Sequence, residues 1–403
     1  MIGGTLPGTG INTFSPAFIV PRYGTGVVGG AEELARKTAG ELARRGIEVT
    51  VLTTCALDHH TWQDHYPPGT CVDNGVRVMR FPGRTRLGEP GLARLTAAIC
   101  GGEDVTREDQ EAWFSGVVSS PELVRHLERE GSRYSHLLFL PYLYGTTFLG
   151  TRVRPDRSWI LPCLHDEPFA WLPAVKDMLS SVAGLIFNSP GERRLASRVL
   201  EKEDPGPAVG MGFYPGEGNA ASFRNRFPVR GDFVLYAGRR EEGKNTPLLV
   251  EYFRRFAAER PGLASLVLVG SGKVDIPADS LLLVHDLGRL PEAAKSDAFA
   301  AASVFCTPSV NESLSIVLME SWLAGRPALV NRHCEVTCEH VTRSGGGLSF
   351  GNYHEFAACL EMLLGNPGLA DKLGSAGRSY VFREYNWDSV IQRLLDALEV
   401  NAG

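Results

Sequence analysis

The sequence AEELARKTAGELARRG, residues 31–46, lies between two short apolar runs at 13–20 and 48–53. Its apolar side chains recur at intervals of three and four residues, and Gly46 follows as a stop signal, so the pattern predicts an amphipathic helix. An apolar strand, a glycine-rich loop, a helix and a second strand together form a βαβ unit. The two strands of such a unit run parallel in one sheet, with the helix packed on its face.

The same alternation continues through both halves of the chain. Further strands are expected in the first half at 76–81, 136–140, 159–164 and 184–188, and in the second half at 232–237, 264–269, 281–285, 304–307 and 327–330. Repeated βαβ units predict an α/β protein with doubly wound parallel sheets. In such sheets, ligands bind at the carboxyl ends of the strands.

A stretch rich in glycine and proline at 202–222 lacks periodicity and separates the two halves. We therefore expect an N-terminal Rossmann-like domain at 11–205, a C-terminal Rossmann-like domain at 206–385 and a closing amphipathic helix within 386–403. The first ten residues are expected to be a leader outside the fold, because they have neither the basic start nor the apolar core of a signal peptide.

The composition excludes several classes of protein. Of the 403 residues, 43% are hydrophobic and 22% charged, a balance that fits a globular enzyme and not a collagen-like or disordered chain. The net charge of −5 argues against a nucleic-acid partner, which usually requires a basic surface. No apolar run approaches the roughly 18 residues of a membrane span, and the basic segment 35–45 allows at most peripheral membrane contact. The eight cysteines lie mostly within apolar runs, which favours reduced thiols and a cytoplasmic location.

The first candidate binding segment is the loop RYGTGVVGGAEE, residues 22–33. Its glycines let the backbone approach a ligand closely, and the start of the following helix offers unpaired N–H groups to an anion. The spacing is not GxGxxG, so a tight turn without a ligand is the alternative interpretation.

A second candidate, YAGRREEGKN at 236–245, follows an expected strand. Arg239 and Lys244 lie just past the carboxyl end of that strand. An arginine there can bind a phosphate through two N–H groups, and a lysine can supply a mobile charge, so the pair suits a diphosphate leaving group. Because acidic and basic residues are adjacent, a solvated charged turn is the alternative.

The third candidate is VFCTPSVNESLSIVLMESWLAGRPALV, residues 304–330. A strand ends at Pro308, and a polar loop leads to a helix that is expected to begin near Ser313. Glu312 and Glu320 would lie about 12 Å apart along that helix, too far for one acid–base pair but suited to two contacts with an extended ligand. In the alternative interpretation, Glu312 is only a charge at a helix N-terminus and Glu320 is a solvated residue.

The segment from Glu312 to Glu320 resembles the E-x7-E motif of the retaining nucleotide-sugar glycosyltransferases of family 4, which have the GT-B fold of two facing Rossmann-like domains. Further segments match the same family in the same order across nearly the whole chain. They are the Gly29-Gly30 loop, RRGIEVTVLT at 44–53, LPCLHDEP at 161–168, GRREEGK at 238–244, VLVGSG at 267–272 and DLGRL at 286–290. The closing helix resembles the one that crosses back to the N-terminal domain in this family.

The resemblance implies four catalytic residues: His165, Arg239, Lys244 and Glu312. Arg239 and Lys244 would bind the donor diphosphate and stabilise the leaving nucleotide, and Glu312 would contact the donor sugar. His165 would lie near the anomeric carbon, where it can hydrogen-bond the sugar or shield developing positive charge.

The resemblance also implies a set of donor-binding residues. They are Gly29, Gly30, Gly238, Leu290, Ser313, Leu314, Ser315, Ile316 and Glu320. Glu320 would hydrogen-bond the ribose hydroxyls, and Leu290 would lie against the base. The N–H groups of Ser313, Leu314 and Ser315, at the expected helix start, would face a phosphate. Leu314-Ser315 replaces the commoner Phe-Gly, which adds a side chain close to the phosphate path.

The resemblance thus implies a glycosyltransferase that needs no cofactor. The donor is expected to be a UDP- or GDP-sugar, and the acceptor a hydroxyl of a saccharide, a glycolipid or a small molecule. The transition state resembles an oxocarbenium ion, so the main requirement is to neutralise the charge growing on the leaving diphosphate. No carboxylate pair suits a double displacement. The acceptor hydroxyl would therefore attack from the face that the diphosphate leaves, a phosphate oxygen would take its proton, and the anomeric configuration would be retained.

One cluster could instead bind a metal ion. His333, Cys334, Cys338 and His340 lie within eight residues of one another. The spacing Cys-x3-Cys-x-His is not a common one for zinc, so packing of a loop and a helix is expected there and no metal site.

Three other functions remain open. A sugar-nucleotide epimerase or hydrolase can share this fold and would turn over the donor without an acceptor. A nicotinamide-dependent dehydrogenase would bind NAD, but the first loop departs from GxGxxG. A carbohydrate-binding module would need neither the cationic pair nor both carboxylates.

Overall fold

The computed structural model describes residues 14–216, 218–240, 242–280 and 282–399. The chain divides into two compact units, one formed by Met1–Gly212 with Trp387–Gly403 and the other by Phe213–Asn386. The predicted boundary at 205/206 lies a short way before this division. The predicted leader, residues 1–10, lies outside the described residues.

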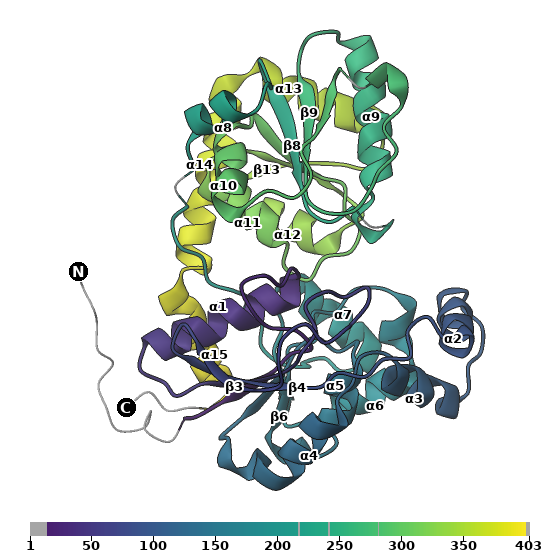
Figure 1. The fold of residues 1–403 in the computed structure, drawn as a ribbon. Coiled ribbons are helices and arrows are strands. Elements are labelled where there is room, and N and C mark those ends of the chain that lie inside the picture. The colour runs from purple at the N-terminus through teal and green to yellow at the C-terminus, as the bar shows by residue number, and fades with distance from the viewer. Residues whose placement is uncertain (1–13, 217, 241, 281, 400–403) are drawn as a thin grey trace. The chain divides into compact units, whose positions relative to one another are not determined.

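The first unit contains, within the described residues, a seven-stranded sheet in the order β3-β4-β2-β1-β5-β6-β7 (Figure 1). The strands are β1 (Ala17–Ile19), β2 (Thr50–Thr54), β3 (Gly69–Asp73), β4 (Val76–Phe81), β5 (Leu137–Phe139), β6 (Ser158–Ile160) and β7 (Gly184–Leu185). Neighbouring strands are parallel except for β3 and β4, which pair antiparallel. Asn74 and Gly75, with φ angles of 50° and 82°, form the tight turn of that hairpin.

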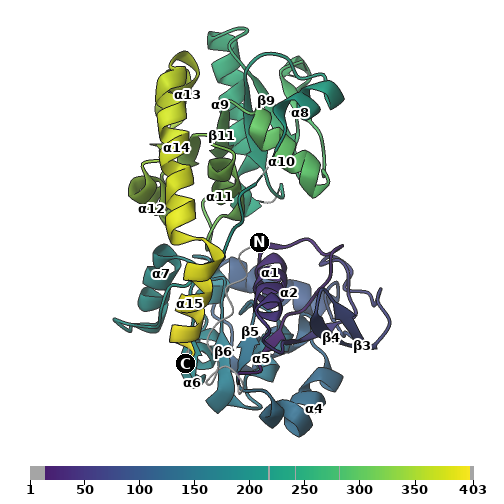
Figure 2. The same cartoon turned by 90° about the vertical axis from the view of Figure 1, so that its left-hand side faces the viewer.

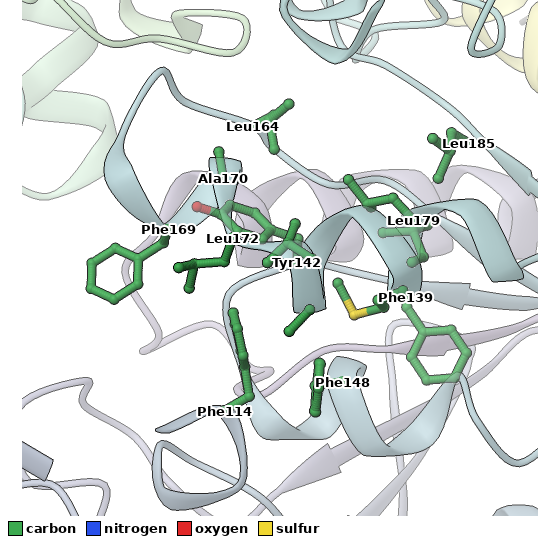
Figure 3. Packing of buried hydrophobic residues seen from close by; sticks show 14 of the residues in the cluster. Phe114, Phe139, Tyr142, Phe148, Leu164, Phe169, Ala170, Leu172, Leu179 and Leu185 are labelled. Carbon is green, nitrogen blue, oxygen red and sulfur yellow. The ribbon is translucent and has the colours of Figure 1, made fainter. Parts of the chain in front are cut away.

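Helices connect these strands and cover both faces of the sheet. They are α1 (Gly30–Arg44), α2 (Pro90–Cys100), α3 (Arg107–Gly116), α4 (Pro121–Glu130), α5 (Gly145–Gly150), α6 (Pro173–Ser181), α7 (Pro190–Leu200) and α15 (Trp387–Ala397). Alternate strand residues point to opposite faces, and those on one face join a buried cluster with side chains from α2 to α7. Figure 3 shows part of this cluster, with Phe139 of β5 near Phe148 of α5 and Leu179 of α6. Helix α1 lies over the face opposite α4 (Figures 1 and 2).

The closing helix α15 packs on this first unit. Arg45, which follows α1, forms an ion pair with Asp388, and Arg393 donates hydrogen bonds to the carbonyl of Val209. Gly212 lies against the indole ring of Trp387, so that any side chain at position 212 would collide with the ring. The helix therefore belongs to the first unit although the preceding residues, up to Asn386, belong to the second.

The second unit contains, among the described residues, a six-stranded sheet in the order β10-β9-β8-β11-β12-β13, and its neighbouring strands are all parallel. The strands are β8 (Phe233–Ala237), β9 (Ser265–Val269), β10 (Val284–Asp286), β11 (Val304–Thr307), β12 (Ala328–Asn331) and β13 (Gly347–Phe350). The helices are α8 (Ala220–Arg226), α9 (Thr246–Glu259), α10 (Glu292–Ala301), α11 (Ile316–Leu323), α12 (Glu335–Ser344), α13 (Tyr353–Gly365) and α14 (Pro367–Glu384). Short 3-10 turns are η2 (Gly131–Arg133), η3 (Pro155–Arg157) and η4 (Pro168–Trp171) in the first unit, with η5 (Glu242–Lys244) and η6 (Ala278–Ser280) in the second.

These two sheets confirm the predicted class, an α/β chain with two Rossmann-like parallel-sheet domains. Sequence analysis missed two strands. It missed β3 because that strand is exposed along nearly its whole length, and it missed β13 because that strand is short and follows a run of glycines. Over the part of the chain that the structure describes, no helix combines the length and apolar character needed to cross a bilayer.

Candidate active site

Two segments of the second unit bring a lysine and a glutamate together. Strands β8 and β11 are parallel neighbours, so the segments that follow them leave the same edge of the sheet. One segment carries Lys244 in η5 and the other carries Glu312, and Val310 N–H donates to the carbonyl of Gly243 between them. The ammonium of Lys244 lies 2.8 Å from Glu312 Oε1. Two of the four predicted catalytic residues are therefore in direct contact.

Helix α11 begins later than predicted. The expected start near Ser313 is wrong, because α11 begins at Ile316 and Ser315 precedes it in the left-handed conformation, with a φ of 67°. Leu314 is buried, so the residues before the helix pack against the unit as a loop and not as a helical turn. The unpaired N–H groups of a helix start therefore begin at Ile316, and those of Ser313 and Leu314 lie outside the helix.

Glu312 and Glu320 are both held by lysines. Glu320, in α11, lies with Oε1 2.8 Å from the ammonium of Lys295 in α10, and only 14% of its side chain is exposed. Glu312 precedes α11 by several residues and is 10% exposed. Neither alternative interpretation fits, since Glu312 lies outside the helix and Glu320 is not a solvated residue.

Lys295 contacts the candidate site through Glu320, and sequence analysis missed it. Its ammonium also lies 3.1 Å from the exposed carboxylate of Glu292. Burial alone would lower the pKa of Lys295, but the carboxylates of Glu320 and Glu292 outweigh burial and raise this pKa above its usual value. Lys295 therefore stays charged and holds the Glu320 carboxylate. Nothing in the local sequence signals this contact, because it joins side chains on two different helices.

The two adjacent arginines after β8 have different surroundings. Arg240 is buried, forms an ion pair with Asp286 at the end of β10, and donates to the carbonyl of Gly272. Arg239 is half-buried, and its carbonyl accepts a hydrogen bond from the hydroxyl of Tyr236. Arg240 thus links the segments that follow β8 and β9 to the end of β10 at the carboxyl edge of the sheet. The segment that carries Arg240 is therefore not the solvated charged turn of the alternative interpretation.

Gly238 and Leu290 lie at the same edge. Gly238 has a φ of 151°, which favours glycine, and its N–H donates to the carbonyl of Val269. Leu290 is half-buried, just before α10, which carries Lys295. The described geometry thus gathers Gly238, Leu290 and the two lysine–glutamate pairs on segments that leave the carboxyl ends of neighbouring strands.

In the first unit, the glycine-rich loop is held by a buried ion pair. Arg22 and Glu32 are almost fully buried and lie 2.5 Å apart, and Arg22 also donates to the carbonyls of Val28 and Leu57. Gly29 precedes α1 and lies so close to the Glu32 carboxylate that a Cβ atom there would collide with it. Gly30 faces open space. A side chain at position 29 would therefore displace the Glu32 carboxylate, whereas one at position 30 would meet no such obstacle.

His165 belongs to the loop that follows β6. It is half-buried, and the residue before it, Leu164, is fully buried in the cluster of Figure 3. His165, Gly29 and Gly30 thus belong to the first unit, and the other predicted site residues belong to the second.

The four candidate metal ligands are buried or hydrogen-bonded to other groups of the second unit. His340 is fully buried, with Nδ1 3.0 Å from the hydroxyl of Tyr380, and burial lowers its pKa to about 3. The Cys338 thiol donates to backbone carbonyls, Cys334 is buried, and His333 N–H donates to the side chain of Asn331. Throughout the described ranges, no group of three or more histidine, cysteine or acidic side chains is placed to hold a metal ion.

Comparison with known proteins gives one family match and many relatives of nearly full length. Residues 219–380 match the family model described as "Glycosyl transferases group 1". The chain is 25% identical over 397 residues to a D-inositol 3-phosphate glycosyltransferase of Acidothermus cellulolyticus, covering 92% of this chain and 86% of the relative. It is 26% identical over 413 residues to the protein of the same name from Mycobacterium avium, covering 92% and 89%.

Solved structures share the whole fold. Sucrose-phosphate synthase from Thermosynechococcus elongatus superposes with a TM-score of 0.70 at 18% identity, covering 95% of this chain and 98% of that one. Anabaena Alr3699/HepE in complex with UDP-glucose gives 0.66 at 16% identity, covering 96% and 99%. WaaG, a glycosyltransferase involved in lipopolysaccharide biosynthesis, gives 0.64 at 14% identity, covering 96% and 100%.

Proposed function

Because the chain is a group 1 glycosyltransferase with the GT-B fold, we propose that it moves a glycosyl group from a nucleoside diphosphate sugar to an acceptor hydroxyl with retention of anomeric configuration. The observation that carries the proposal is the Lys244–Glu312 pair at the carboxyl edge of β8 and β11. A cation able to neutralise a diphosphate and a carboxylate able to accept hydrogen bonds from sugar hydroxyls stand side by side there.

In this proposal the second unit binds the donor. Arg239 and Lys244 bind the diphosphate and stabilise the charge that grows as it leaves, which is the largest contribution expected for such a reaction. A diphosphate competes with Glu312 for the Lys244 ammonium, which leaves the carboxylate available to the sugar hydroxyls. The start of α11 adds positive backbone dipole near Ile316.

Glu320 binds the ribose and Leu290 the base in the same proposal. A carboxylate that accepts hydrogen bonds from two adjacent hydroxyls must be fixed in orientation, and the ion pair with Lys295 supplies this condition. Lys295 therefore acts as a positioning residue for Glu320. The glycine pair Gly29-Gly30 lets substrate approach the backbone of the first unit.

His165 acts at the anomeric carbon, by hydrogen-bonding the donor sugar or shielding its positive charge. Glu312 and Glu320 are each paired with a different lysine, and in this proposal neither acts as the nucleophile of a double displacement. The acceptor hydroxyl then attacks from the face that the diphosphate leaves, and a diphosphate oxygen takes the hydroxyl proton. The reaction takes place in the cytoplasm, a compartment consistent with the eight cysteines, which are all described and form no disulfide.

The donor to test first is a UDP-sugar. The HepE structures contain UDP, UDP-glucose or UDP with glucose, and the trehalose-6-phosphate protein from E. coli was solved with UDP-2-fluoro glucose. A GDP-sugar is the second donor class to test. The curated relatives named above place D-inositol 3-phosphate on the acceptor panel, beside neutral saccharides and glycolipids.

The test incubates the purified chain with UDP- and GDP-sugars, with and without each acceptor, and determines the anomeric configuration of the product by proton NMR. We expect transfer with retention that depends on Lys244 and not on the exposed Lys372, for which Lys372→Ala is the matched control. Donor hydrolysis or epimerisation at the same rate without acceptor would contradict the transfer reaction. A product with inverted configuration would contradict the attack from the leaving-group face.

A further inference from the structure

A buried carboxylate joins two loops at the carboxyl edge of the first unit. Strands β6 and β7 are parallel neighbours, and the segments after them carry Leu164 and Asn188. Glu192, in the first turn of α7, accepts the N–H of Leu164 on Oε1 and the N–H of Asn188 on Oε2, both at 2.6 Å. Leu164 directly precedes His165, so Glu192 fixes the backbone from which the His165 side chain extends.

The burial of Glu192 is unusual for an acidic side chain. Its exposed fraction is 1%, and the partners that act on its carboxyl group in the described structure are the hydrogen-bond donors of Asn188 and Leu164, with no basic side chain among them. Burial raises its pKa to about 8, while the N–H donors of Asn188 and Leu164 favour the ionised form. Burying a carboxyl group is costly unless its oxygens accept hydrogen bonds, and here each oxygen of Glu192 accepts one backbone N–H.

Capping of α7 does not by itself explain this burial. Glu355, in the first turn of α13, caps its helix in the same way: it accepts the N–H of Gly351, four residues earlier, while its own N–H donates to Asn352. Glu355 is only half-buried and lies beside Arg332. The feature that distinguishes Glu192 is the additional hydrogen bond to Leu164, 28 residues away in the sequence.

Hydrogen bonds also hold the backbone on the C-terminal side of His165. Glu167 accepts a hydrogen bond of 2.7 Å from the hydroxyl of Tyr142, and Glu167 N–H donates to the carbonyl of His165. Tyr142 and Leu164 both belong to the buried cluster, as Figure 3 shows. His165 therefore lies between two anchored points, one formed by Glu192 through Leu164 and one formed by Tyr142 through Glu167.

We infer that Glu192 is a positioning residue for His165, which it keeps in one orientation by holding the Leu164 backbone. This inference rests on the proposed function, in which His165 acts on the donor sugar. Small displacements of a catalytic group can lower turnover by about 100-fold. Donor binding is expected to change little, because the residues proposed to bind the diphosphate and ribose belong to the second unit.

The test compares Glu192→Gln with the matched variant Glu355→Gln. A glutamine at 192 presents one oxygen and one NH2 group to two N–H donors, so one of the two hydrogen bonds is lost. We expect kcat to fall by about tenfold or more, within the range of such displacements, while KM for the donor stays within about twofold. Glu355→Gln, which also loses a capping carboxylate, should leave both constants unchanged.

A double-mutant cycle separates positioning from a merely structural role. In a His165→Ala background, Glu192→Gln should change kcat by less than about twofold, because the group that it positions is gone. An equal loss of kcat in both backgrounds would overturn the inference. Hydrogen exchange at the Leu164 amide gives an independent readout: faster exchange in Glu192→Gln supports the link between the two loops, and unchanged exchange overturns it.

Failure of the proposed function can be recognised separately. If His165→Ala retains wild-type turnover, then His165 has no role in the reaction and Glu192 is not positioning a catalytic group. The exchange rate of Leu164 would still decide whether Glu192 holds that loop. If neither variant nor wild type transfers sugar, the proposed reaction is wrong, and the exchange experiment remains valid because it needs no substrate.

Discussion

Lys244 Nζ lies 2.8 Å from Glu312 Oε1, although 68 residues separate the two in the sequence. The side chains come from segments that follow two neighbouring parallel strands, β8 and β11. Each partner neutralises the other in a half-buried position, where an unpaired charge would be costly. In the proposed function, a donor diphosphate binds the Lys244 ammonium in place of Glu312. The Glu312 carboxylate then becomes available to the hydroxyls of the donor sugar.

Substitution of Lys244 tests that exchange of partners. We expect Lys244→Ala to lower kcat by about 100- to 1,000-fold, since it removes the charge that stabilises the leaving group in the proposed function and leaves Glu312 without its cation. Steady-state kinetics with the best donor–acceptor pair measures this. Lys372→Ala, on the exposed surface of α14, is the control and should behave as wild type. A Lys244→Ala variant with kcat within threefold of wild type would remove Lys244 from the mechanism.

Lys295 offers a second test, on donor affinity. Lys295→Met keeps the aliphatic stem but removes the ion pair that holds the Glu320 carboxylate in the orientation that the proposed function requires for ribose binding. We expect the Kd for the nucleoside diphosphate, measured by calorimetry, to rise by about tenfold, which corresponds to about 1.4 kcal/mol. Glu292→Gln removes the exposed partner of the same lysine and should change Kd by less than twofold. Equal Kd values for Lys295→Met and wild type would show that Lys295 does not act through Glu320.

The fold followed from the sequence because its elements obey local rules. Helix α1 repeats its apolar residues at helical spacing and ends before Gly46, and most strands are apolar runs bounded by turn residues. Strand β3 is not such an apolar run, since it lies at the edge of the sheet and its side chains are exposed. The Asn74-Gly75 dipeptide was the available signal for it, because this pair favours the tight turn of a hairpin.

The site was less predictable because it depends on contacts between distant segments. The spacing of Glu312 and Glu320 singled out both carboxylates as candidates, but the lysine that holds Glu320 comes from another helix and has no local signature. The start of α11 depends on Ser315, whose left-handed backbone is unusual for a residue other than glycine. Arg239 and Arg240 are adjacent and chemically identical in the sequence, and only the position of Asp286 tells which one is buried.

The two arginines should therefore respond differently to the same substitution. Arg240→Met leaves Asp286 unpaired and removes hydrogen bonds between three loops, so we expect it to lower the free energy of unfolding by about 1–3 kcal/mol. Arg239→Met should lower this free energy by less than Arg240→Met does, since the Arg239 side chain is only half-buried. In the proposed function it should still lower kcat by about 100-fold. Urea unfolding and steady-state kinetics on both variants test the distinction, and the reverse pattern would contradict the assignment.

His340 should make the stability of the second unit depend on pH. Burial against Tyr380 lowers the pKa of His340 to about 3 in the folded chain, whereas an unfolded histidine has a pKa near 6.5. Between these values the unfolded chain binds a proton that the folded chain does not. The contribution of His340 is therefore fully present above pH 6.5 and is lost as the pH falls, at about 1.4 kcal/mol per unit.

The measurement compares urea unfolding of wild type and His340→Gln at pH 7.5 and 5.5. Glutamine can still hydrogen-bond Tyr380 but does not titrate, so the variant should lose about 1 kcal/mol less stability than wild type on going to pH 5.5. His354→Gln, at an exposed position of α13, provides the control and should keep the wild-type pH dependence. If His340→Gln and wild type lose equal stability over this interval, His340 is not the buried neutral group that drives the acid sensitivity of this unit.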